Sequence, residues 1–183
     1  MDGSEYLTLL EKRLGHLFRV QRDYSVLEEL FHLYAQCEIQ NERYFGSKNV
    51  KLWRADNYEY TLVRCYEEMT QNNLLELTDF LKQAVDSLVK PHEEHMTSII
   101  SGVIVIDKEP TPNIIRIVER FSYQKAFKMG LQGWCDIRLI LVVPPLNQVY
   151  CNRKAKEVKP FYHPVKSPKK KSLIRKIREV LKS

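Results

Sequence analysis

The stretch of sequence that most constrains the fold is an apolar run near the middle of the chain. Residues 99–106 read Ile-Ile-Ser-Gly-Val-Ile-Val-Ile, and six of these eight residues are β-branched and aliphatic. A short run of this kind is typical of a strand buried on both faces, although its period alone also fits a buried helix. A second apolar series, Ile137, Leu139, Leu141 and Val143, follows at strand spacing. We expect the rest of the chain to be arranged around these two segments.

The segments that precede the apolar run predict an antiparallel meander. Apolar and polar residues alternate over residues 31–40, which indicates a half-buried strand that can continue to residue 45. Residues 50–53 and 58–66 predict two further strands, with a hairpin loop at Ala55-Asp56-Asn57 between them. Because short connections pair neighbouring strands, these strands should lie side by side in one sheet.

Three segments carry helix signals. Ser4 is a candidate N-cap for a helix near the N-terminus. Thr70 begins the most regular helix, whose leucine-rich stripe ends before Pro91. Thr111 and Pro112 occupy the cap and the first position of a third helix. Further strands are expected over residues 121–129, from residue 134 and around residue 149.

These elements predict an α+β fold. We expect a largely antiparallel twisted sheet, built from an N-terminal meander and C-terminal strands and packed by two main helices. An N-terminal helix and a basic C-terminal helix complete it. With 183 residues, the chain suits a single α+β domain over residues 1–160, followed by a basic linker and amphipathic helix over residues 161–183.

Composition agrees with an ordinary globular protein. Hydrophobic residues make up 44% of the chain and charged residues 28%. No segment approaches the roughly 20 apolar residues that a membrane-spanning helix needs. The first residues include Asp2, Glu5 and Glu11 and show no basic-then-apolar leader, so we expect a cytoplasmic protein.

Two sequence segments carry a resemblance to a known family. The run from Glu94 to Val103, and Gly130-Leu131-Gln132-Gly133-Trp134 followed by Asp136-Ile137-Arg138, resemble a small family of uncharacterised bacterial proteins. That family is classed only as a domain of unknown function. The similarity covers roughly residues 5–162 and omits the basic C-terminal residues. It implies no activity, ligand, cofactor or catalytic residue.

The four cysteines do not predict a cofactor. Cys37, Cys65, Cys135 and Cys151 are far apart in the sequence and form no Cys-x-x-Cys pair. Each falls in an expected strand, where a thiol behaves as a small buried hydrophobe. The spacing favours neither zinc nor a disulfide framework.

His92-Glu93-Glu94-His95 is a weak candidate for a metal site. A zinc-protease helix places its two histidines at i and i+4, whereas these two are at i and i+3 and Pro91 precedes them. Polar residues of a surface loop are the favoured interpretation.

Asp136 with Glu157 and Lys159 is a weak candidate for a metal-dependent nuclease. Such enzymes hold Mg²⁺ between carboxylates and place a lysine near the attacking water. Glu157, however, lies in a basic segment with few apolar residues, so we favour a structural ion pair of Asp136 with Lys125 or Arg138. Nucleophile and phosphate-loop motifs are absent from the sequence, and we expect a protein that is not an enzyme.

Aromatic and basic residues are interleaved in the first meander. Such a face can stack single-stranded bases, but tyrosine is also an ordinary occupant of a half-exposed strand, which we favour. The residues concerned are Tyr34, Tyr44, Trp53, Tyr58, Tyr60 and Tyr66, with Arg43, Lys48, Lys51, Arg54 and Arg64.

The C-terminal segment carries the strongest functional signal. Residues 151–183 contain 12 lysines or arginines and two glutamates, whereas residues 1–150 contain 17 basic and 21 acidic residues. Ser172 can cap an amphipathic helix that follows a lysine run. Its candidate nucleic-acid-binding residues are Lys169, Lys170, Lys171, Arg175, Lys176 and Arg178.

Three interpretations of this helix stay open. It can pack on the mildly acidic body, bind nucleic acid through phosphate contacts, or lie on an anionic membrane surface, which is the least favoured. We expect a binding module whose basic segment engages an anionic partner, most plausibly nucleic acid. The alternatives are a metal-dependent nuclease or other hydrolase, and a segment with a purely structural role.

Overall fold

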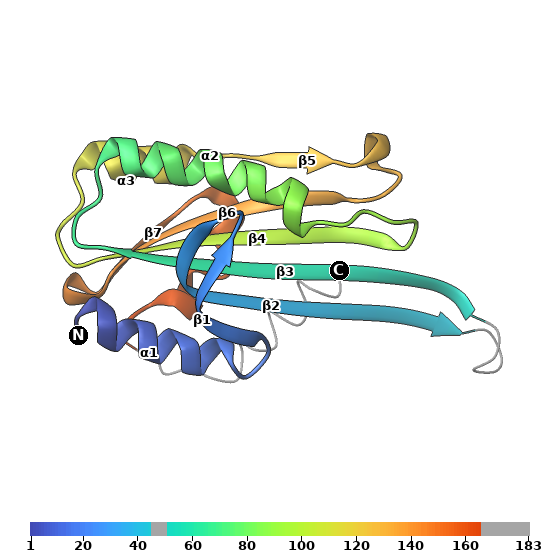
Figure 1. Ribbon diagram of the computed structural model, residues 1–183, viewed down its shortest axis with the longest axis horizontal. Helices are drawn as coiled ribbons and strands as arrows, with labels where there is room; N and C mark the ends of the chain where they lie inside the picture. Colours follow the sequence, from blue (N-terminus) through green and yellow to red (C-terminus); the bar gives the residue numbers. More distant parts are fainter. Residues whose placement is uncertain (45–50, 166–183) are drawn as a thin grey trace.

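The computed structural model describes residues 1–44 and 51–165, and within 40–44 and 51–55 only the backbone. One sheet of seven strands lies between helices that pack on both of its faces (Figure 1). The helices are α1 (Gly3–Leu14), α2 (Gln71–Leu88) and α3 (Pro112–Arg120). The strands are β1 (Arg19–Val26), β2 (Glu29–Tyr44), β3 (Lys51–Tyr66), β4 (His95–Ile106), β5 (Gln124–Ala126), β6 (Trp134–Val143) and β7 (Gln148–Cys151). Four 3₁₀ turns follow the later strands: η1 (Lys128–Gly130), η2 (Pro144–Leu146), η3 (Arg153–Ala155) and η4 (Lys159–Tyr162).

The sheet is mixed, with antiparallel pairs at its edges and parallel pairs at its centre. The strand order is β1-β2-β3-β4-β6-β5, and β7 also pairs with β6. The β3–β4 and β4–β6 pairs are parallel, and the other four are antiparallel. The α+β class and the mostly antiparallel sheet are therefore confirmed. The parallel centre arises because α2 and α3 return the chain to the same end of the sheet before each new strand begins.

The apolar run is a central strand, as its composition predicts. From Ser98 to Ile106 every residue of β4 is buried. One face of the sheet packs against α2 and α3, where Leu81, Val85 and Val118 meet Ile100 and Ile104. The other face packs against α1 and the C-terminal 3₁₀ turns. Among the described residues, no helix combines the length and apolar character required to cross a membrane.

Two of the described helices start after the predicted capping residues, and the N-terminal helix starts after a different one. Thr70 and Thr111 accept hydrogen bonds from the backbone amides of Asn73 and Ile114, as the sequence predicts. At the N-terminus, however, Asp2 and not Ser4 is the N-cap. Its carboxylate accepts from the Glu5 amide, and the Glu5 side chain accepts in return from the Asp2 amide.

Two strand predictions are wrong. The expected hairpin loop at Ala55-Asp56-Asn57 does not exist, because β3 runs without a break from Lys51 to Tyr66. These three residues pair with Asn41, Gln40 and Ile39 of β2. The expected strand over residues 121–129 is only β5, since Lys128 and Met129 adopt left-handed backbone conformations.

β2 and β3 continue past their neighbours as a two-stranded arm (Figure 1). The β1–β2 pairing begins at Arg19 and Gln36, and the β3–β4 pairing begins at Asp56 and His95. Beyond these points the described backbone of residues 40–44 and 51–55 pairs only within the arm. We call this ribbon, residues 40–44 and 51–55, the arm, and we call the end of the sheet from which it projects the arm end.

Candidate functional site

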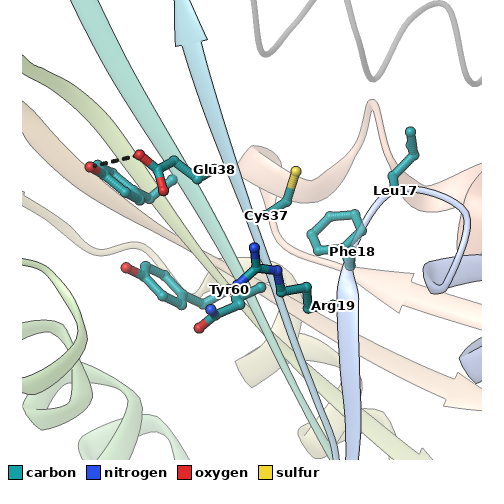
Figure 2. A pocket seen from close by; sticks show the side chains of 8 residues that line it. Leu17, Phe18, Arg19, Cys37, Glu38 and Tyr60 are labelled. Carbon is teal, nitrogen blue, oxygen red and sulfur yellow. Dashed lines mark hydrogen bonds between the residues drawn. The ribbon is translucent and has the colours of Figure 1, made fainter.

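A hollow of about 590 Å³ lies at the base of the arm. It forms where β1 begins and leaves the edge of β2 without a neighbour among the described strands. Figure 2 shows Phe18 and Cys37 on one side of the strands, Glu38 and Tyr60 on the other, and Arg19 between them. The full lining is Leu17, Phe18, Arg19, Gln36, Cys37, Glu38, Tyr58 and Tyr60.

The chemistry of the hollow is that of a binding surface. Aromatic rings, a guanidinium and a carboxylate are the groups that contact bases, phosphates and polar ligands. The Tyr58 hydroxyl donates to the Glu38 carboxylate at 3.5 Å, and the Tyr60 hydroxyl donates to the Leu88 carbonyl at 3.0 Å. Burial raises the pKa of Tyr60 and of the Cys37 thiol, so both are protonated at neutral pH.

A row of rings connects the hollow to the turn between β5 and β6. The Tyr58 ring stacks on His95 with 6.0 Å between centroids, and His95 meets Phe127 edge-on at 5.8 Å. His92 lies beside the row, with its Nε2 atom 3.5 Å from the Tyr58 hydroxyl and 3.6 Å from a carboxylate oxygen of Asp56. These contacts bring four ring side chains together at the arm end: Tyr58 of β3, His95 of β4, His92 just before β4 and Phe127 just after β5.

His95 is bound on both ring nitrogens. Its Nδ1 atom lies 2.6 Å from the Gln132 carbonyl oxygen, and its Nε2 atom lies 2.9 Å from the Ser98 hydroxyl. Since a carbonyl only accepts, Nδ1 carries the proton and Nε2 accepts from Ser98. Burial lowers the pKa of His95, which keeps the ring neutral.

This arrangement bears on the candidate metal site at His92 and His95. Both nitrogens of His95 are occupied, so a metal ion would have to displace one of these hydrogen bonds. In the part of the chain that the structure describes, no three His, Cys, Asp or Glu side chains are grouped in a way that could hold a metal ion.

The other face of the sheet holds a buried ion pair that the sequence analysis missed. Arg138 of β6 reaches across β4 and donates to Glu59 of β3 at 2.8 Å, with both side chains only 5% exposed. Alternation of Asn57, Glu59 and Thr61 with tyrosines along β3 is the only sequence signal for this polar row. Tyr162 covers the row from η4, and its hydroxyl lies beside Thr61 and Ser101.

Asp136 lies on the same face but is not joined to its predicted partners. Lys154 of η3 binds the Asp136 carboxylate at 2.8 Å. Glu157 is exposed, and no interaction among the described residues links Glu157 or Lys159 to Asp136. The structure therefore gives Asp136 a structural ion pair, although the partner differs from the Lys125 or Arg138 suggested by the strand pattern. Lys125 instead pairs with Asp86.

All four cysteines lie in strands as free thiols. Burial raises the pKa of Cys65 to about 11 and that of Cys135 to about 12, so neither is a thiolate at neutral pH. They behave as packing residues.

The candidate nucleic-acid-binding residues Lys169, Lys170, Lys171, Arg175, Lys176 and Arg178 lie outside the described residues. The segment that leads to them is anchored on α1. Arg13 donates to the carbonyls of Phe161, His163 and Pro164, and Tyr6 donates to that of Tyr162. The described chain is therefore held against α1 as far as Pro164.

Comparison with known families gives one match. Residues 2–164 match the family described as Domain of unknown function (DUF8052). The chain belongs to this family. The DUF8052 match spans all described helices and strands and stops before the lysine run, as the resemblance in the sequence indicates. Neither the curated proteins nor the solved structures contain a match to the chain.

Proposed function

We propose that this DUF8052 protein is a nucleic-acid-binding module that acts in the cytoplasm without catalysis. The arm is the observation that carries the proposal. An antiparallel ribbon of two strands is one of the two elements that the major groove of a duplex admits. Residues 40–55 contain four lysines or arginines and one acidic residue, Glu42. A ribbon of this composition favours contact with a phosphate backbone.

Two further features support the same partner. The hollow at the base of the arm combines Arg19 with the rings of Tyr58 and Tyr60, which are surfaces suited to phosphate and base contacts. Residues 166–183 contain eight lysines or arginines and a single glutamate. Because each phosphate that is neutralised releases counterions, binding through such groups is strongly salt-dependent.

The test is a titration of a fluorescently labelled duplex of about 30 base pairs, followed by anisotropy between about 50 and 200 mM KCl. The full chain should bind with an affinity that falls steeply with salt. The triple variant Arg43→Glu, Lys51→Glu, Arg54→Glu should weaken binding by at least about tenfold and flatten the salt dependence. Truncation after Val165 should independently reduce the salt dependence of binding.

The matched control reverses three cations away from the arm, Lys12→Glu, Arg116→Glu and Arg120→Glu, which lie on α1 and α3. This control changes the net charge equally and should leave the salt slope close to that of the full chain. If both triple variants bind alike, the attraction is non-local and the arm has no special role. If the full chain does not bind any duplex at low salt, the proposal is wrong.

A further inference from the structure

The turn between β5 and β6 exposes two apolar side chains on a fixed backbone. We call residues 127–133 the apolar loop. Met129 is 98% exposed and Leu131 is 80% exposed. Met96 and Trp134, at the starts of the neighbouring strands β4 and β6, are 39% and 37% exposed. Single exposed apolar residues are ordinary, whereas these four all lie at the arm end of the sheet, in the apolar loop and at the starts of two paired strands.

The backbone of the apolar loop is held in an unfavourable conformation. Lys128 and Met129 have φ of 45° and 56°, in the left-handed region that non-glycine residues rarely adopt. The loop is closed by backbone hydrogen bonds, including Phe127 to Gly133 at 3.0 Å and Gly130 to Phe127 at 2.9 Å. Strained backbone persists where the surrounding structure enforces it, and such positions cluster at functional sites.

Two residues lock this loop to the sheet. His95 binds the Gln132 carbonyl and packs edge-on against Phe127. Gly133, with φ of 73°, lies so close to β4 that a Cβ atom would approach the Met96 carbonyl oxygen to 2.2 Å. The backbone of the apolar loop therefore holds Met129 and Leu131 at fixed positions, so little backbone freedom remains to be lost on binding.

The charge and the position of the apolar loop indicate which ligand it contacts. Residues 121–134 contain Lys128 and Lys125, of which Lys125 pairs with Asp86, and they contain no Asp or Glu. The loop lies at the arm end of the sheet, on the same side of the molecule as the start of β4 and the arm (Figure 1). A ligand that is anionic outside and apolar between its stacked units matches both Lys128 and the exposed apolar side chains. Duplex DNA has this character, and proteins insert Met or Leu between its base pairs as wedges.

We infer that the apolar loop is a wedge that enters between base pairs of a DNA duplex held by the arm. This inference rests on the proposed function and specifies its partner as duplex DNA that is locally unstacked. Met129 and Leu131 replace part of the stacking of the opened step, and Lys128 lies next to the backbone phosphates. Flexible steps such as TA, which unstack at the least cost, should be preferred.

The test uses the full chain and duplexes that carry 2-aminopurine beside central TA steps, with donor and acceptor dyes at the ends. The expected result is a rise in 2-aminopurine fluorescence and a shorter distance between the ends on binding. The variant Met129→Ala, Leu131→Ala should abolish both signals and weaken binding by about tenfold or less, with the salt slope retained. Its thermal unfolding should match the full chain, because neither side chain is buried.

The matched control is Leu27→Ala, Leu30→Ala. These two leucines are each 49% exposed and lie at the β1–β2 turn, at the opposite end of β2 from the arm. The control should keep both fluorescence signals.

The outcomes separate the wedge from the function on which it rests. Salt-dependent binding without any fluorescence change overturns the wedge and leaves the proposed function standing, whereas no duplex binding overturns both. The last measurement uses vesicles that contain phosphatidylglycerol. If they bind the full chain but not the Met129→Ala, Leu131→Ala variant, and duplex signals are equal in the two, the loop docks on anionic membranes and the wedge is overturned.

Discussion

The buried ion pair of Glu59 and Arg138 carries a large desolvation cost. Burial raises the pKa of Glu59, while the guanidinium of Arg138 opposes that rise. One carboxylate oxygen of Glu59 accepts from Arg138, and the other has no hydrogen-bond partner among the described residues. Removing charges from water costs several kcal/mol per ion, so each member of the pair depends on the other.

Arg138→Met should therefore destabilise the fold strongly. The substitution leaves a buried carboxylate without its counter-charge, and the expected loss in unfolding free energy is about 3–5 kcal/mol. The double variant Glu59→Leu, Arg138→Met should recover most of this loss, because it removes both charges from the interior. Urea unfolding followed by circular dichroism measures both values. A double variant that is as unstable as the single one would show that the pair is not the cause.

His95 should make stability depend on pH. Burial holds its folded pKa below the ordinary value of about 6.5. As pH falls through about 6.5, the unfolded chain takes up a proton that the folded chain does not, so unfolding becomes easier. This loss continues until the pH reaches the folded pKa, with a slope of at most about 1.4 kcal/mol per pH unit.

The matched variant for this prediction is His95→Gln, which keeps hydrogen-bonding groups but does not titrate. Its unfolding free energy, measured by urea titration from pH 8 to about pH 5, should vary less with pH than that of the natural chain. Burial also lowers the pKa of His163. This residue is present in both proteins, so it contributes equally to the pH dependence of their stability. Parallel pH profiles for the two proteins would exclude His95 as the titrating group.

At the scale of elements, the fit of α2 on the sheet depends on a glycine. A Cβ atom at Gly102 of β4 would lie 2.3 Å from a methyl carbon of Leu81. Gly102→Ala should cost about 1–3 kcal/mol through overpacking, and Leu81→Ala about 2–5 kcal/mol through the cavity that it leaves. In the double variant the new methyl group occupies part of that cavity, so the combined loss should be smaller than the sum. A double-mutant cycle from urea unfolding measures this coupling, and strict additivity would contradict the contact.

Elements with strong local signals are the ones that the sequence predicts well. α2 and α3 begin directly after their capping residues Thr70 and Thr111, as expected. The capping side chains, and the proline at the first position of α3, act within one turn. β4 is predicted for a similar reason, because a strand buried on both faces has few polar residues.

Two features that depend on distant pairing are not predicted. Ala55-Asp56-Asn57 has the composition of a turn, yet Asp56 pairs with Gln40 in β2 and its amide donates to the Glu94 carbonyl. These contacts override the local preference. The parallel strand pairs at the centre of the sheet could not be predicted either. Alternation of apolar and polar residues shows which face of a strand is buried, but not the direction in which the strand runs.

Viewed as a whole molecule, the candidate site is a property of the topology. The hollow exists because β1 begins at Arg19, opposite Gln36, while β2 and β3 continue. No local motif encodes where a neighbouring strand stops, so the aromatic and basic residues of the meander could be predicted from the sequence, but the arm and its base could not. The charge division along the chain, in contrast, is visible in composition alone.

The arm and the body should be separable. Replacing residues 41–55 with Asn-Gly keeps the Gln40–Asp56 pair and closes β2 and β3 with a two-residue hairpin. Since the described arm backbone pairs only within the arm, the melting temperature should stay within about 4 °C of the natural value. Duplex binding, in contrast, should weaken by at least about tenfold, with a shallower salt dependence, because the cations of the arm are gone while those after Val165 remain. Calorimetry and anisotropy on the same preparation test the two halves of this prediction independently. A large drop in melting temperature would mean that the arm stabilises the body, and unchanged binding would assign the nucleic-acid contacts to the C-terminal segment alone.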